Sequence, residues 1–341
     1  MFGQSLLSAF DAAPPLVPAD NFNTVLYNGN GGTQSITSVG FAPDFTWIKS
    51  TTLAVDHAAF DTVRGATKYL SPSTTGAEGT YSTVLNAFGS NGFTVGSNAG
   101  VNFSGQTYVS WNWKAGGTAV SNTDGTITSQ VSANVYAGFS VITYNGATNA
   151  TADTSNNGGA YWSVAHGLGA APDLVFVKKR NGAGGWYVGG AALGSTGANG
   201  NHLVLNDSAA QVGEANILWG GSQTFNATTF GLGGWDVVNR NGDSYVAYCF
   251  KSISDYSKVG SFVGTGTSGN FVYVGFQPRF VLVKPIYADS WRIVGFNGTY
   301  ELRPNSSGAE SNNNVLTINP TGFTLNTADA NSGNVMYLAI A

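Results

Sequence analysis

An apolar run introduced by a proline occurs three times along this chain, at residues 40–49 (GFAPDFTWIK), 169–178 (GAAPDLVFVK) and 275–284 (GFQPRFVLVK). Proline fixes its own φ and has no backbone N–H, so it suits the entrance of a strand. The residues that follow it are apolar and mostly aromatic or β-branched, which is typical of a strand buried on both faces. The pattern predicts three equivalent buried strands. Each ends in a lysine that we expect to reach water at the strand exit, namely Lys49, Lys178 and Lys284.

A second phrase follows each copy, at residues 104–114 (SGQTYVSWNWK), 241–251 (NGDSYVAYCFK) and 332–341 (SGNVMYLAIA). In the first two copies every second residue is apolar or aromatic, which predicts a strand with one such face. We align Met336 of the third copy with Tyr108 of the first, although the aromatic residue of the third copy is displaced by one place. Two phrases that recur together in the same order indicate an internal triplication.

The repeats divide the chain into an N-terminal arm (1–21), a first repeat (22–117), a linker (118–134), a second repeat (135–252) and a third repeat (253–341). Turn-forming Gly, Asn and Asp recur between short runs of aromatic and β-branched residues, and no stretch has the pattern of a long amphipathic helix. The predicted fold is all-β, with three tandem β-sandwich repeats of jelly-roll-like topology behind an extended arm.

Composition narrows the choice of partners. Only 9% of the 341 residues are charged and the net charge is -4, which argues against a nucleic-acid binder because such proteins carry a basic surface. No apolar run approaches the roughly 18 residues of a membrane span, so we expect no membrane insertion. The single cysteine, Cys249, excludes an intrachain disulfide framework and is interpreted as an inert core residue.

The arm has three prolines, which favour an extended conformation, and four large apolar residues that would be wasted on solvent. We expect this arm to dock on a neighbouring subunit or on a larger particle, although a disordered tail is the simpler alternative. The predicted docking residues are Phe2, Leu6, Leu7 and Phe10.

Motifs with catalytic chemistry are weak in this sequence. Residues 264–269 match G-x-G-x-x-G, but a strand rather than a helix is expected to follow, which argues against a dinucleotide site. The histidines, His57, His166 and His202, occupy non-equivalent positions in the repeats without metal-ligand spacing, and we interpret them as solvent or loop residues. We therefore predict no enzymatic activity, no catalytic residues, no metal and no cofactor.

Aromatic residues outside the repeated phrases are candidates for stacking on sugar rings, with core packing as the alternative for each. Trp186 and Tyr187 follow the glycine-rich residues 182–185, so a loop tip is expected there. With Trp291, they are the predicted glycan contacts. The other aromatic residues considered in this way are Tyr161, Trp162, Trp219 and Tyr300.

The repeated phrases also carry a family resemblance. Residues 40–49, 63–68 (VRGATK), 91–96 (NGFTVG) and 108–117 (YVSWNWKAGG), with the opening residues 1–8 (MFGQSLLS), resemble a repeated β-domain of virion structural and tail-fibre proteins of tailed bacteriophages, especially marine ones. The first repeat matches well, the second with insertions, and the third only at its anchors. The resemblance implies a component of the virion and brings no catalytic residues with it.

We therefore expect a structural protein of a phage particle, located in the virion as part of the tail or a fibre, with host-surface recognition by its distal repeats. A homo-oligomer, with a trimer favoured, and other virion proteins are the expected partners, with a host-surface glycan as a further one. A capsid-surface fibre or decoration protein is the alternative. A carbohydrate-active enzyme is the hypothesis from another class, and would need paired carboxylates flanking a cleft.

Overall fold

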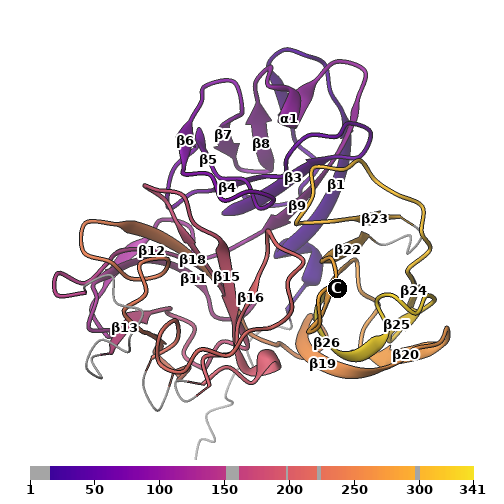
Figure 1. The fold of residues 1–341 in the computed structure, drawn as a ribbon. Helices are drawn as coiled ribbons and strands as arrows, with labels where there is room; N and C mark the ends of the chain where they lie inside the picture. Colours follow the sequence, from indigo (N-terminus) through magenta and orange to yellow (C-terminus); the bar gives the residue numbers. More distant parts are fainter. Residues whose placement is uncertain (1–15, 151–160, 197–198, 221–223, 296–299) are drawn as a thin grey trace, which may run out of the picture.

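The computed structural model describes residues 16–150, 161–196, 199–220, 224–295 and 300–341. Almost all regular structure in these residues is β-strand, and every ladder between named strands is antiparallel. Figure 1 shows three lobes around a common centre, with the first lobe in indigo and purple, the second in magenta to red and the third in orange to yellow. The predicted all-β sandwich class is confirmed.

The first lobe packs a four-stranded sheet against a small three-stranded sheet. The strand order of the large sheet is β1 (Phe22–Asn28), β9 (Thr107–Trp113), β3 (Phe45–Ser50), β4 (Ala58–Asp61). The small sheet has the order β2 (Gln34–Ile36), β8 (Gly92–Val95), β7 (Leu85–Gly89). The remaining elements are the 3-10 turn η1 (Pro18–Asp20), the hairpin of β5 (Lys68–Tyr69) and β6 (Gly79–Thr80), and the one-turn helix α1 (Ala99–Asn102).

The second lobe is built on a seven-stranded sheet. Its order is β10 (Val120–Asn122), β11 (Ser129–Asn134), β12 (Phe139–Asn145), β18 (Ser244–Phe250), β14 (Leu174–Lys179), β15 (Trp186–Gly189), β16 (Leu203–Val204). A two-stranded sheet of β13 (Trp162–Ala165) and β17 (Thr229–Leu232) accompanies it, and the 3-10 turn η3 (Ala191–Leu193) follows β15.

The third lobe pairs a five-stranded sheet with a three-stranded one. The large sheet has the order β19 (Ser257–Thr265), β26 (Ser332–Ile340), β21 (Phe280–Pro285), β22 (Arg292–Gly295), β23 (Glu301–Leu302). The small sheet has the order β20 (Asn270–Tyr273), β25 (Gly322–Leu325), β24 (Leu316–Asn319).

The two repeated phrases form neighbouring strands in every large sheet. The apolar runs behind the prolines are β3, β14 and β21, and all six residues of each strand are buried. The closing phrases are β9, β18 and β26, which pair directly with these strands. Each closing strand thus lies in the interior of its large sheet, with the apolar-run strand on one side and β1, β12 or β19 on the other.

The segment 118–134 corrects the predicted linker. It contains β10 and β11, and β11 pairs with β12 along its whole length, from Ser129↔Tyr144 to Asn134↔Phe139. The Gly, Thr and Ser content of this segment resembles a flexible connector. However, β10 is the edge strand of the sheet and β11 lies between β10 and β12, so backbone hydrogen bonds hold this segment in place without many large side chains.

The closing strand of the third lobe is displaced by one residue from the predicted alignment. Lys284 pairs with Met336 where Lys49 pairs with Val109, so Met336 corresponds to Val109 rather than to Tyr108. Tyr337 therefore lies on the opposite face of its sheet, where its ring centroid is 5.6 Å from that of Phe323 in the small sheet. A one-residue shift moves every side chain of a strand to the other face.

Each large sheet is buried on two faces. One face packs against the small sheet of its own lobe and forms a separate core in each of the three lobes. The other face points to the centre of the molecule, where residues from all three large sheets form one shared cluster, the central core. At its middle, the ring of Phe280 lies 5.8 Å from Phe22 and 5.5 Å from Trp113, and the ring of Trp113 lies 6.1 Å from Phe139. The three lobes are consecutive in sequence but in space surround one aromatic core.

Candidate functional site

The lobes are joined at equivalent positions by a ring of hydrogen bonds. In each lobe an indole or imidazole nitrogen, on the first residue of the strand that pairs with the lysine's strand or on the residue just before it, donates to a backbone carbonyl of the next lobe around the centre. The pairs are Trp186 Nε1 to Ser71 O (2.8 Å), Trp291 Nε1 to Val204 O (2.9 Å) and His57 Nε2 to Arg303 O (3.1 Å). His57 Nδ1 accepts from Trp47 Nε1 at 2.9 Å, so its Nε2 carries the proton and donates.

This ring corrects two predicted glycan contacts. Trp186 is 1% exposed and Trp291 is 0% exposed, because both indoles are inserted between lobes. Tyr187 is half-buried, and its ring lies 5.3 Å from Trp235 and 5.7 Å from His202. Tandem aromatics after a glycine-rich stretch indicated a loop tip, but Trp186 and Tyr187 belong to the strand β15. Neither tryptophan offers a face on which a sugar could stack.

The repeated lysines also differ from expectation, because none of the three reaches water. Each is fully buried and its Nζ donates to backbone carbonyls. Lys49 donates to Ser50 O (2.7 Å) and Leu53 O (3.0 Å). Lys178 donates to Lys179 O (2.9 Å) and Thr75 O (3.3 Å). Lys284 donates to Pro285 O (2.7 Å), Tyr287 O (3.0 Å) and Ala209 O (3.1 Å). Burial lowers the pKa of each lysine to about 8. Lys178 and Lys284 bond carbonyls of the adjacent lobe and so help to join the lobes.

The contact between the second and first lobes is closed by a buried ion-pair network. Arg64 Nε lies 2.5 Å from Asp61 Oδ2 and Arg64 Nη1 lies 3.1 Å from Glu78 Oε2. The second lobe contributes Tyr248, which donates to Asp61 Oδ2 at 2.7 Å, and Arg180, which lies 2.9 Å from Glu78 Oε1. Burial alone would raise the pKa of Glu78, but the two guanidinium groups hold it below its usual value. These charges are satisfied by one another, as a structural network requires.

The histidines are buried and not in solvent, which corrects that part of the interpretation, although His57 and His166 do lie in the connecting segments next to β4 and β13. His166 Nδ1 accepts the Leu168 N–H at 3.1 Å and its Nε2 lies 3.0 Å from Asn226 O, while His202 Nδ1 lies 3.1 Å from Gly200 O. Burial lowers the pKa of His57 to about 3 and also lowers that of His166. Cys249 is free and buried in β18, and burial raises its pKa. Among the described residues, no group of three or more His, Cys, Asp or Glu side chains could hold a metal ion.

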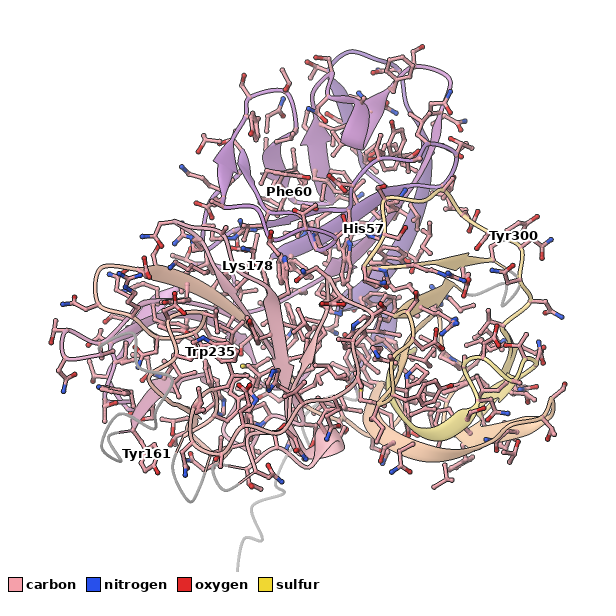
Figure 2. All side chains as sticks on the ribbon, viewed as in Figure 1. His57, Phe60, Tyr161, Lys178, Trp235 and Tyr300 are labelled. Atoms are coloured by element: carbon pink, nitrogen blue, oxygen red, sulfur yellow. The ribbon has the colours of Figure 1, made fainter. Side chains whose placement is uncertain are left out.

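The best candidate for a binding site is a cleft between the first and third lobes, with a volume of about 440 Å³. Its wall from the first lobe is formed by β1 and β9, and its wall from the third by β22 and β23. On the rim, Leu26 is 63% exposed and Tyr300 is 39% exposed, and Figure 2 shows Tyr300 on the outer side of the third lobe. The residues that line this cleft (Thr24, Leu26, Tyr27, Asn28, Thr51, Thr107, Val109, Trp111, Ile293, Gly295, Tyr300, Leu302 and Glu310) come from both lobes.

Polar atoms in the cleft have hydrogen-bonding capacity to spare. Trp111 Nε1 and Thr24 Oγ1 are buried beneath its surface and have no partner in the described part of the chain. Glu310 lines the cleft and is tied to the first lobe through its backbone N–H, which donates to Thr51 O at 2.9 Å. Burial raises the pKa of Glu310, and the nearby Lys49 partly offsets this.

Sequence reasoning found only part of this cleft. Tyr300 was among the aromatic residues considered for sugar stacking, but Leu26 and Glu310 were not singled out. Leu26 lies on an alternating strand and Glu310 in a polar loop, so nothing in their local patterns distinguishes them. Both gain their position from the contact between lobes that are separated by most of the chain.

The predicted docking residues Phe2, Leu6, Leu7 and Phe10 lie outside the described residues. The first described residue, Leu16, packs against the central core. Close to it, Val135 (51% exposed) and Tyr136 (70% exposed) border a second cavity that Leu16 and Val17 also line. In the third lobe, Val263, Phe271 and Tyr273 are exposed on the edge strands β19 and β20.

Comparison with known proteins identifies a family but no function. A family model described as a domain of unknown function (DUF7483) matches residues 17–341, so the chain belongs to this family. No curated protein and no solved structure matches the chain. Within the described residues, no helix is long and apolar enough to cross a membrane.

Proposed function

We propose that this member of the DUF7483 family is a structural protein of a tailed-bacteriophage virion, a component of the tail or of a fibre that contributes to recognition of the host surface. The proposal rests on the resemblance of residues 40–49, 91–96 and 108–117 to the repeated β-domain of such proteins. It places the chain at the particle surface and gives it other virion proteins and a second copy of itself as partners.

The observation that best supports this proposal is the closed arrangement of three equivalent sheets around one aromatic core. Hydrogen bonds from Trp186, Trp291 and His57 join each lobe to the next. At the same three junctions a backbone N–H donates to a carbonyl of the neighbouring lobe, from Glu78 to Arg180 O (2.7 Å), from Gln211 to Ile286 O (2.6 Å) and from Glu310 to Thr51 O (2.9 Å). Such a body is held together at every junction, which suits a part that must keep its shape within an assembly.

This arrangement bears on how copies would associate. The surfaces that three separate β-units would bury against one another are already covered within a single chain. A homo-oligomer, for which a trimer is favoured, would therefore use the outer surfaces. The free edges of β1 and β19 offer unpaired backbone groups for that purpose.

The capsid surface is the second candidate position. A single chain with three equivalent lobes fits a threefold position of a particle, because matching symmetry allows the same contact to be made three times. Icosahedral shells have such positions, and so do trimeric fibres. The tail or fibre remains the first choice because the sequence resemblance names it.

Electron microscopy of intact particles with a label on this chain tests the proposal. We expect the label on the tail or fibre, and a label on the head surface would select the decoration role instead. If the chain is absent from purified particles, the proposal fails.

Deletion of residues 1–15 tests the docking arm in the same particles. The shortened chain should remain folded, because the described lobes begin after it, and should no longer be incorporated. Normal incorporation would show that attachment uses another surface.

A further inference from the structure

The three contacts between lobes are equivalent in backbone but are filled differently. In the first lobe β3 pairs with β4 so that Phe45 lies opposite Asp61, and in the third β21 pairs with β22 so that Phe280 lies opposite Gly295. Asp61 and Gly295 therefore occupy the same place in their sheets. In the first lobe this position carries a carboxylate, and in the third lobe it carries no side chain.

Two of the three contacts are closed by side chains. Between the second and first lobes, Asp61 and the Arg64 three residues later bind Tyr248 across the junction. Between the third and second lobes, β15 leads into η3, and Leu193 of this turn is buried in the central core against β19 and β26.

The third contact, between the first and third lobes, contains the cleft. A Cβ added to Gly295 would meet no heavy atom of the described residues within 4 Å. Trp111, which corresponds to Tyr248 in strand register, lines the cleft with an indole N–H that has no partner in the described residues, whereas the Tyr248 hydroxyl is bound to Asp61. Asp61, which accepts the hydrogen bond from the Tyr248 hydroxyl, is replaced at this junction by Gly295.

The composition of the cleft restricts its ligand. Apolar and aromatic side chains form its walls, while hydroxyl and amide groups of Thr51, Thr107 and Asn28 lie at its border. Among the described lining residues Glu310 is the one charged group, and the buried Lys49 ammonium nearby, which is bonded to backbone carbonyls, offsets its charge only in part. An anionic ligand would find no Arg or Lys in this lining and would be repelled by the carboxylate. A cationic ligand would find a single carboxylate in this lining, whose charge the Lys49 ammonium partly offsets.

We propose that this cleft binds a neutral carbohydrate, with one sugar ring stacked on Tyr300 and Leu26 and its hydroxyl groups bonded to the Glu310 carboxylate and the neighbouring threonines. A volume of about 440 Å³ lies within the range of roughly 300–1,000 Å³ found for small-ligand sites, which are mostly apolar with a few polar groups that orient the ligand. The proposal specifies the host-recognition part of the proposed function and rests on it for its biological meaning, but the binding can be measured on the isolated chain.

Saturation-transfer NMR of the full chain tests the site directly. The probes are the methyl glycosides of glucose, galactose, mannose and N-acetylglucosamine, with sialyllactose as an acidic probe and tetramethylammonium as a cationic one. We expect at least one neutral glycoside to bind. If none of the four binds, or if the acidic or cationic probe binds more tightly than all of them, the proposal is overturned.

Variants locate the binding. Gly295→Leu places a side chain in the open space of the cleft and should weaken binding at least ten-fold, as should Tyr300→Ala. Glu310→Gln keeps the shape of the side chain but weakens a charge-assisted acceptor, so a several-fold loss is expected. Tyr273→Ala is the matched control, because Tyr273 is also an exposed tyrosine of the third lobe (67% exposed) but does not line the cleft.

Thermal melting of each variant separates loss of the site from loss of the fold. Binding that survives both Gly295→Leu and Tyr300→Ala in folded protein would overturn the assignment to this cleft. If the chain binds a glycoside but is absent from virions, the carbohydrate site is supported and the virion role is rejected. If the chain is present in virions but binds no glycoside, the virion role is supported and the carbohydrate site is rejected.

Discussion

The junction between the second and first lobes and the junction between the first and third lobes are built on the same strand pairing. The first of these junctions is filled by side chains, whereas the second contains a cleft. One holds Asp61, Arg64 and Tyr248 in a buried network, and the other places Gly295 beneath an open cleft with Trp111 in its wall. The backbone repeats, whereas the side chains at one position per lobe decide whether a junction is a permanent contact or a site accessible to a ligand. The large sheets share their strand pairing, and the junction that carries glycine at this position is the one that holds the cleft.

The largest expected effect comes from breaking the closed junction. Arg64→Ala leaves the Asp61 carboxylate buried without its cation, and truncating one partner of a buried pair typically costs about 3–5 kcal/mol. Urea denaturation should show this loss. The exposed Arg279 is the control, and its replacement by Ala should change the free energy of unfolding by less than about 0.5 kcal/mol. A loss below about 1 kcal/mol for Arg64→Ala would show that the network does not hold the lobes together.

Acid should weaken the open junction through His57. Its pKa falls from the usual 6.5 to about 3 on burial, so the unfolded chain binds more protons and stability is lost as the pH falls below about 6.5. Between pH 6.5 and pH 5 this residue alone should cost about 2 kcal/mol. His57→Gln retains an acceptor for Trp47 and a donor for Arg303, and should remove that part of the pH dependence. An unchanged slope of unfolding free energy against pH would contradict the assigned role.

The ring hydrogen bonds should contribute similarly at the two tryptophan positions. Trp186→Phe and Trp291→Phe each remove an indole N–H. Ser71 O and Val204 O keep the backbone N–H of Thr74 (3.3 Å) and of Asp207 (3.1 Å), so the lost hydrogen bond should cost about 0.5–1.5 kcal/mol. The loss of ring volume adds to both variants alike. Calorimetric melting should give equal decreases. Unequal decreases in melting temperature would show that the two hydrogen bonds, although equivalent in geometry, contribute unequally to stability.

The smallest effect is expected at the open position itself. Gly295→Ala adds a methyl group where no heavy atom of the described part of the chain lies within 4 Å and where the backbone is not in the left-handed region. The loss of freedom in the unfolded chain should stabilise the protein by about 0.4–1 kcal/mol. Gly322 in β25 provides the contrast, since a Cβ there would lie 2.0 Å from Val272 O and Gly322→Ala should destabilise. Destabilisation by Gly295→Ala would mean that the cleft is closed in solution.

Much of the fold could be read from the repeated phrases, and little of the site could. The prolines and apolar runs predicted β3, β14 and β21, and the alternating phrases predicted β9, β18 and β26, because strand composition is local. The role of Trp186 was not predictable, since its local sequence suits an exposed loop tip as well as a strand. Its burial depends on Ser71, more than a hundred residues away.

The sequence by itself determined the fold class. Its periodicity and turn residues indicate strands, and its recurring phrases correspond to neighbouring strands in each large sheet. Tertiary structure decided everything that involves more than one lobe. It buried three lysines that were expected at the surface, because the lobes supply backbone carbonyls for their ammonium groups. It also made a cleft from Leu26, Tyr300 and Glu310, which meet only when the third lobe returns to the first. Hydrophobic periodicity indicates which face of a strand is buried, but not which distant segment covers that face. The proposed carbohydrate site depends on that distant segment, because its walls come from two lobes.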